Sequence, residues 1–288
     1  MHCFYINLDR DEERRQFLEA NFAQHKPTHW DLQRVAAVDA DEVRQLNVGG
    51  KLAANVKGCF LSHARAMLTA MPVEGHIMIL EDDALFGPQS CQVIDGAIRA
   101  LPEGSWDILF TDLFLIGFRR VARYLLERRG LLAESKNVLK LIEINMRISG
   151  TTAYVVNRRS REKVLQCVEQ ARSISLPYDA FLSKKISQDK EIRAYMTFPF
   201  ATSISHFADN TTVHSSNPDL KCAHNAWNAI RRLMWWNRDV DQIIQNLNRL
   251  VPQEDIDKES QALGYMLSIC LSKNAGRMAL AFVNYDNY

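Results

Sequence analysis

The sequence lacks long hydrophobic runs and has no excess of charge of either sign. Its longest apolar stretch, residues 113–118, is far shorter than the roughly 18 residues that a membrane-spanning helix needs. The 288 residues include 35 Lys and Arg against 34 Asp and Glu, a formal net charge of +1. Proteins that bind nucleic acid through bulk charge carry strongly basic domains. The composition therefore excludes a membrane-spanning helix and a nucleic-acid partner held by bulk charge.

Glycine, proline and cysteine are also sparse. With 12 Gly and 8 Pro the chain is neither fibrous nor of low complexity. The closest two of its 6 cysteines, Cys59 and Cys91, are 32 positions apart, which excludes a zinc-binding pair and a dense disulfide framework. We therefore expect free thiols in a reducing compartment. The N-terminus becomes charged at Asp9 and Arg10, unlike a secretory signal, and we expect a cytoplasmic protein.

Short apolar runs alternate with helical patterns over residues 1–217. The β-rich runs lie at residues 4–8, 34–38, 76–80, 106–110 and 153–156. Helical patterns follow at residues 11–18, at 57–68 after a glycine turn, and at 160–171. This alternation predicts an α/β fold, a Rossmann-like, mainly parallel sheet flanked by helices. After residue 217 only helical spacing recurs, so we predict a domain over residues 1–217 and an all-helical C-terminal extension over residues 218–288 packed on it.

Three consecutive carboxylates, Glu81, Asp82 and Asp83, directly follow the sharpest apolar run of the chain. Adjacent carboxylates repel one another and are poor strand formers, so their place at the end of a buried strand needs a reason. In open α/β sheets, ligands bind at the carboxyl ends of the strands, and carboxylate oxygens suit Mg²⁺ or Mn²⁺. The alternative is an inert, solvated acidic turn.

Four sequence blocks in order resemble glycosyltransferase family 25, which includes bacterial lipooligosaccharide galactosyltransferases. The resemblance covers about residues 3–205. The blocks are Tyr5-Ile6-Asn7-Leu8-Asp9-Arg10 with Glu13-Arg14-Arg15, Gly58-Cys59-Phe60-Leu61-Ser62-His63, Ile79-Leu80-Glu81-Asp82-Asp83-Ala84, and Ser149-Gly150-Thr151-Thr152-Ala153-Tyr154 with Pro177-Tyr178-Asp179-Ala180-Phe181-Leu182.

The resemblance implies a fold of the GT-A type and an inverting transfer of a hexose, most often galactose. The donor would be a UDP-sugar, and the acceptor a saccharide or glycolipid of a bacterial lipooligosaccharide or LPS. A divalent metal, Mn²⁺ or Mg²⁺, would be held by the acidic motif, a variant of Asp-x-Asp in which Glu81 replaces the first Asp. We favour Asp83 as the direct metal ligand, and the choice of Glu81 or Asp82 as the second stays open.

An inverting transfer needs a base that deprotonates the acceptor hydroxyl. Asp179 is the first candidate, because it follows Pro177 and precedes an apolar helical pattern. The alternative is that Asp179 only caps that helix. Asp112, expected at the end of another strand, is the second candidate base.

Residues near the end of the first strand are candidates for the nucleotide site. Asn7 and Asp9 could hydrogen-bond a uridine ring, and Arg14 could bind the diphosphate, although Arg14 could equally pair with Asp11 on its own helix. Asp9 is also placed to cap that helix.

The block that begins at Gly58 suggests a phosphate site. If Ser62 and His63 lie early in a helix after Gly58, the backbone N–H groups there suit phosphate. A single His in a helix more often has a structural role, but the family resemblance favours a functional role for His63. By analogy with other GT-A enzymes, a late residue, His206, could complete the metal shell.

The charge is distributed unevenly along the chain. Residues 119–147 carry a net charge of +5, from eight Lys and Arg against three Glu, and the apolar residues at 121, 122, 125 and 126 predict a basic amphipathic helix. This segment could contact anionic lipid or a phosphorylated acceptor, which would place the protein peripherally on the inner face of the bacterial inner membrane. The alternative is a solvated helix.

Two other functions compete with glycosyl transfer. A metal-dependent nucleotidyltransferase also places carboxylates at strand ends, but the sequence shows no Gly-rich nucleotide loop. A non-catalytic sugar-nucleotide-binding module could keep the same fold, and the intact acidic triplet argues against it.

Overall fold

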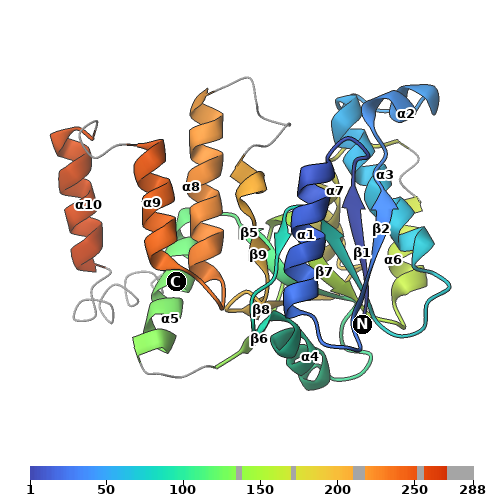
Figure 1. The fold of residues 1–288 in the computed structure, drawn as a ribbon, viewed down its shortest axis with the longest axis horizontal. Helices are drawn as coiled ribbons and strands as arrows, with labels where there is room; N and C mark the ends of the chain where they lie inside the picture. Colours follow the sequence, from blue (N-terminus) through green and yellow to red (C-terminus); the bar gives the residue numbers. More distant parts are fainter. Residues whose placement is uncertain (134–137, 170–172, 210–217, 252–255, 271–288) are drawn as a thin grey trace.

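The computed structural model describes residues 1–133, 138–169, 173–209, 218–251 and 256–270 (Figure 1). Its strands are β1 (His2–Asn7), β2 (Asp31–Ala36), β3 (Ile77–Glu81), β4 (Ala84–Leu85), β5 (Ile108–Leu115), β6 (Lys140–Glu143), β7 (Ile148–Val156), β8 (Ala194–Phe198) and β9 (Ser203–Ile204). Its helices are α1 (Glu12–His25), α2 (Ala40–Gln45), α3 (Ala54–Thr69), α4 (Ser90–Ala100), α5 (Phe118–Ala133), α6 (Arg161–Glu169), α7 (Tyr178–Ser187), the 3₁₀ turn η1 (His206–Asp209), α8 (Pro218–Met234), α9 (Val240–Leu250) and α10 (Lys258–Cys270).

Seven strands form one mixed sheet in the order β2-β1-β3-β7-β5-β8-β6. β1 runs parallel to β2 and β3, and β5 runs parallel to β8. β7 is antiparallel to both of its neighbours, and β6 is antiparallel to β8. The predicted α/β fold, with its mainly parallel sheet and helical C-terminal region, is confirmed.

The interior strand β3 is apolar because both faces of the sheet are covered. Ile77 and Ile79 pack on one side with residues of α3, α6 and α7, and Met78 and Leu80 pack on the other with residues of α1 and α4. All four side chains are fully buried. Burial of each of these four side chains stabilises the fold by about 1.5–3 kcal/mol. Because all four must stay buried, the chain leaves the sheet directly after them, at Glu81.

The carboxyl end of β3 is held to a late segment of the chain. After Glu81 the chain turns into β4, which pairs antiparallel with β9, with Ala84 opposite Ile204. The backbone N–H of Ser205 donates to the carbonyl of Asp83 at 2.7 Å. Residues near position 205 therefore lie beside the acidic motif.

Helix α8 packs against the sheet domain. It contacts β5, β9, η1 and α5, and Figure 1 shows it standing beside them. The backbone N–H of Phe200 donates to the carbonyl of Met234 at 3.0 Å, and that of Trp236 donates to the carbonyl of Phe200 at 2.8 Å. The start of the C-terminal helical region is thus tied to the segment that precedes β9.

Several element boundaries differ from those predicted. Helix α3 begins at Ala54, so Gly58 lies inside the helix and no glycine turn precedes it. Helix α1 has Asp11 at its N-cap position, so the prediction that Asp9 caps it is wrong. Helix α7 has Pro177 at its N-cap position, which puts Asp179 in the first turn.

Two further boundaries change how the candidates are placed. Strand β5 continues to Leu115, so Asp112 lies within the strand and not at its end. The basic segment 119–147 is not one helix, because α5 ends at Ala133 and Lys140 begins β6. In the described part of the chain, no helix is long and apolar enough to cross a membrane.

Candidate active site

The carboxylate of Asp82 is held by the first strand and the first helix. Asn7 Nδ2 donates to Asp82 Oδ2 at 2.9 Å, and Arg14 Nε donates to Oδ1 at 2.7 Å. Both Asp82 and Asn7 are buried. Burial raises the pKa of Asp82, and the Arg14 and Asn7 hydrogen bonds oppose that rise. Because both of its oxygens already accept hydrogen bonds, Asp82 serves best as an anchor for Arg14.

Asp83 has fewer partners. Its Oδ2 lies 3.5 Å from Arg14 Nη2, while its Oδ1 is buried and accepts no hydrogen bond. Burial raises the pKa of Asp83, and the charge of Glu81 raises it further, to about 7. The charge of Arg14 opposes this rise. A buried carboxylate oxygen without a partner is costly unless something else compensates it.

Glu81 connects β3 to β7 and α3. Thr151 Oγ1 donates to Glu81 Oε1 at 2.9 Å, and His63 Nε2 lies 3.5 Å from the same oxygen. Burial raises the pKa of Glu81, but the hydrogen bonds and charge of His63 and Thr151 outweigh it, so the pKa is lowered. Glu81 therefore remains ionised beside Asp83.

His63 is buried beneath the acidic motif. Its ring stacks on Tyr178 with centroids 4.1 Å apart, and its Nδ1 lies 3.1 Å from the hydroxyl of Tyr154. The Tyr154 and Tyr178 hydroxyls are themselves 3.0 Å apart. This network fixes the orientation of His63 toward Glu81.

Asp179 is partly exposed and faces the start of β7. Its Oδ2 accepts hydrogen bonds from Ser149 Oγ and, at 3.1 Å, from the backbone N–H of Gly150. The next residue, Thr151, is the one that binds Glu81. Asp179 and Glu81, which are far apart in sequence, therefore both bind to the three consecutive residues 149–151 of β7.

Asp112 is paired with an arginine that sequence reasoning missed. Arg231 of α8 donates through Nε to Asp112 Oδ1 at 3.2 Å and through Nη2 to Asp112 Oδ2 and to Thr152 Oγ1, the latter at 2.9 Å. Asp112 is fully buried and Arg231 nearly so. Burial raises the pKa of Asp112, and the Arg231 charge opposes this. The charges of Glu81 and Asp83 also act on Arg231, which places this cation near the acidic motif.

Gly58 and Ser62 do not form the expected phosphate site. They lie within α3, so their N–H groups are not at a helix N-terminus. A Cβ at Gly58 would lie 2.4 Å from the carbonyl oxygen of Val38, so glycine allows close packing there. Ser62 Oγ donates to the Gly58 carbonyl at 2.7 Å and accepts from the Val38 N–H at 2.8 Å.

Asp9 and His206 lie at the surface near the motif. Asp9 is exposed and pairs with Arg34, which also donates to Asn7 Oδ1 at 3.1 Å. His206 is exposed on η1, with its ring 5.2 Å from that of Phe17. The chain brings His206 close to Asp83 through Ser205, but no contact between the two side chains is seen among the described residues.

The acidic motif fits a divalent cation that takes most of its ligands from substrate and water. No group of three or more His, Cys, Asp or Glu side chains in the described ranges is arranged to hold a metal by itself. Asp83 nevertheless offers an unpartnered oxygen beside Glu81. Mg²⁺ commonly binds through one or two carboxylates together with substrate phosphates. Fully ionised, the four carboxylates Glu81, Asp82, Asp83 and Asp112 exceed the two guanidinium groups of Arg14 and Arg231 by two charges.

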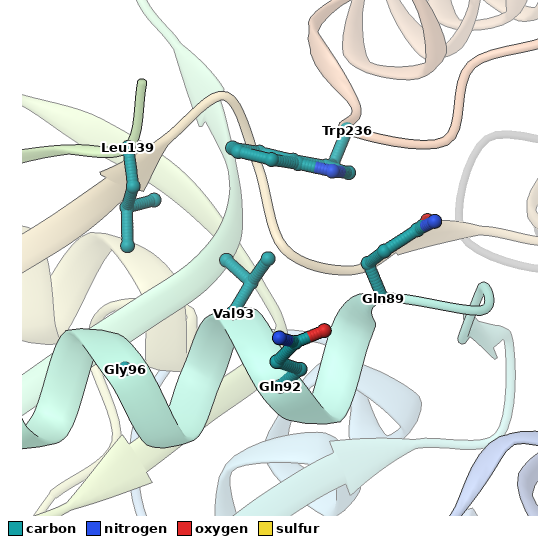
Figure 2. Close-up of a pocket in the computed structure, with 6 residues that line it drawn as sticks. All are labelled: Gln89, Gln92, Val93, Gly96, Leu139 and Trp236. Carbon is teal, nitrogen blue, oxygen red and sulfur yellow. The ribbon is translucent and has the colours of Figure 1, made fainter. Parts of the chain in front are cut away.

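A cavity of about 370 Å³ lies elsewhere, on α4 (Figure 2). Trp236 and Leu139 cover Val93 and Gly96, and two glutamines complete the lining. None of the residues of the acidic motif lines this cavity, so it is distinct from the candidate active site.

An α/β sheet that gathers carboxylates and arginines at the ends of its strands is the arrangement of an enzyme that acts on phosphorylated substrates. The family model "Glycosyltransferase family 25 (LPS biosynthesis protein)" matches residues 1–182 of this chain. The chain therefore belongs to glycosyltransferase family 25 and is a glycosyltransferase. The match includes the acidic motif and Asp179, and it ends before His206 and Arg231.

The solved structures that are similar to this chain include a nucleoside-diphosphate-sugar pyrophosphorylase from Vibrio cholerae RC9. It is 10% identical, covers 68% of this chain and 72% of its own, and has a TM-score of 0.33, which is too low to support an argument. No curated protein matches the chain at a significant level.

Proposed function

We propose that this glycosyltransferase moves galactose from UDP-galactose to a saccharide acceptor of a bacterial lipooligosaccharide or LPS, with inversion at the anomeric carbon and with Mn²⁺ or Mg²⁺ bound. The observation that carries the proposal is the buried, unpartnered Oδ1 of Asp83, which lies beside the ionised Glu81 at the carboxyl end of β3. That charge and that oxygen suit one divalent cation.

The donor would bind across the carboxyl ends of β1 and β3. Asp83 would hold the cation directly with Glu81 beside it, and the cation would neutralise charge on the departing diphosphate. Arg14, fixed by Asp82, lies 3.5 Å from Asp83 and presents a guanidinium to the same region. A guanidinium in a fixed orientation is well suited to phosphate oxygens.

Asp179 would accept the proton of the acceptor hydroxyl. Both of its oxygens accept hydrogen bonds, Oδ2 from Ser149 and Gly150 and Oδ1 from the backbone N–H of Ala180 at 2.7 Å. Unlike Asp112, however, it has no paired cation among the described residues and is partly exposed, so a substrate can reach it. A base must lie within hydrogen-bonding reach of the proton that it removes. Thr151, which follows Gly150 on β7, donates to Glu81, so movement of β7 would affect both parts of the site.

Asp112 serves this mechanism less well as a base. It is fully buried and both of its oxygens accept from Arg231. We propose instead that Asp112 holds Arg231 near the acidic motif.

A donor screen tests the proposal. Thermal unfolding is followed with each UDP-sugar in the presence of Mn²⁺, and we expect UDP-galactose to raise the melting temperature. The matched control is Asp189→Asn, at a partly exposed carboxylate that pairs with Lys184; this variant should keep the rise in melting temperature that Asp83→Asn loses. Stabilisation by a different UDP-sugar would reject UDP-galactose as the donor. If no UDP-sugar stabilises the protein, the hypothesis of a UDP-sugar donor is rejected.

A further inference from the structure

Helix α5 packs against α8, and three arginines lie on α5 and in the link that follows α8 (Figure 1). Arg128 and Arg129 lie on α5, and Arg238 lies in the link between α8 and α9. Arg128 Nη2 donates to the carbonyls of Trp235 and Trp236 at 3.0 and 3.1 Å. Arg238 Nη1 donates to the carbonyl of Leu233 in the last turn of α8 at 3.1 Å. Both side chains therefore attach to the same short segment.

Arg128 is buried, and no counter-ion for it is found among the described residues. Its exposed fraction is 4%, and its Nε is buried and has no hydrogen-bond partner. Arginines this deeply buried are normally paired, because an uncompensated charge in the interior is costly. Two backbone carbonyls accept from Nη2, and the buried Nε–H is left without a partner.

The neighbouring arginines increase this local excess of positive charge. Burial and the charge of Arg238 lower the pKa of Arg128 to about 10, and burial and the charge of Arg129 lower that of Arg238. In the described ranges of the chain, no carboxylate pairs with any of these three residues. The nearest one along α5, Glu127, is already engaged by Arg123 at 3.2 Å and Lys140 at 3.3 Å.

We propose that Arg128, Arg129 and Arg238 form a binding site for a phosphoryl group on a ligand other than the sugar donor. Guanidinium groups match the geometry of phosphate oxygens, and three of them without a carboxylate leave a charge that a phosphate would balance. The phosphoryl group belongs either to a phosphorylated saccharide or to the headgroup of an anionic phospholipid. The site does not depend on the proposed donor chemistry.

Inorganic phosphate is the first probe. Thermal unfolding of the full chain is measured in phosphate and in chloride of matched ionic strength. Wild type should be stabilised by phosphate, and the double variant Arg129→Gln/Arg238→Gln should bind it about tenfold more weakly or worse. Arg120→Gln, which removes one charge from the same helix, should bind like wild type. Arg128→Lys keeps the positive charge, so it tests the role of the buried Arg128 in phosphate binding with less risk to folding than an uncharged variant.

Two arms distinguish the source of the phosphoryl group. If glucose 6-phosphate stabilises wild type but phosphatidylglycerol vesicles do not pellet it, the ligand is a phosphorylated saccharide. If the vesicles pellet wild type and not the double variant, the ligand is a lipid headgroup. An equal phosphate effect in wild type and the double variant, or no effect in wild type, would overturn the proposal. Hydrolysis of the donor, measured as UDP release without an acceptor, should be unchanged in the double variant, so this result is separate from the test of the donor site.

Discussion

Replacing Asp83 by Asn should stabilise the metal-free protein at neutral and alkaline pH. Burial and the charge of Glu81 raise the pKa of Asp83 from 3.8 to about 7. Between these values the folded chain keeps a proton that the unfolded chain has released. The stability contributed by that proton is complete below about pH 4 and is lost as the pH rises through about 7.

The magnitude follows from the size of the shift. A difference of about three pKa units corresponds to about 4 kcal/mol, and partial exposure of the side chain makes this an upper value. An Asn at this position has no charge to lose. The variant should therefore match wild type near about pH 4 and exceed it by up to about 4 kcal/mol near about pH 8.

Urea unfolding in the presence of EDTA, at several pH values, measures this difference. Asp189→Asn is the comparison of opposite sign, because the hydrogen bond from Lys184 lowers the pKa of that carboxyl, and its loss should destabilise the protein above about pH 4. Parallel stability curves for wild type and Asp83→Asn from about pH 5 to pH 8 would refute the reasoning, because they would mean that Asp83 carries no burial penalty.

Three other outcomes are expected. Mn²⁺ alone should raise the melting temperature of wild type more at pH 8 than at pH 6, because the cation competes with the proton on Asp83. For Asp83→Asn the effect of Mn²⁺ should be the same at both pH values. Gly58→Ala should lower the free energy of unfolding by about 1–3 kcal/mol because its Cβ would meet a backbone carbonyl at 2.4 Å, whereas Gly130→Ala, with open space around it, should not. Arg231→Met should lower the free energy of unfolding, measured in urea, by about 3–5 kcal/mol because it leaves Asp112 unpaired. The double variant Arg231→Met/Asp112→Leu should recover most of that loss. Equal losses in the single and double variants would argue against the ion pair.

The parts of the fold that were predictable from sequence are those that local pattern determines. The run at residues 76–80 is apolar at every position except the first, so a buried strand followed by carboxylates could be predicted, and β3 and the acidic motif lie as expected. Strands β6 and β8 were missed. They pair with each other and complete one edge of the sheet, and their place there depends on contacts with distant segments.

The site was predictable where its residues lie in local motifs. Asp82, Asp83 and Asp179 lie near the ends of elements that their own neighbours define. The start of α3 was misplaced because Gly58 was interpreted as a turn, whereas its role is close packing against Val38, which no local pattern reveals. Arg231 was missed because its partner Asp112 is 119 positions away, and only the docking of α8 brings them together.

The rate of UDP release from UDP-galactose, with Mn²⁺ and a saccharide acceptor, tests whether the acidic motif at the end of β3 binds the donor. Wild type should release UDP, and Asp83→Asn should lose this activity by about 100-fold or more while it unfolds cooperatively like wild type. Asp189→Asn should retain the full rate. Equal rates for wild type and Asp83→Asn would contradict the assignment of the donor site to the acidic motif at the end of β3.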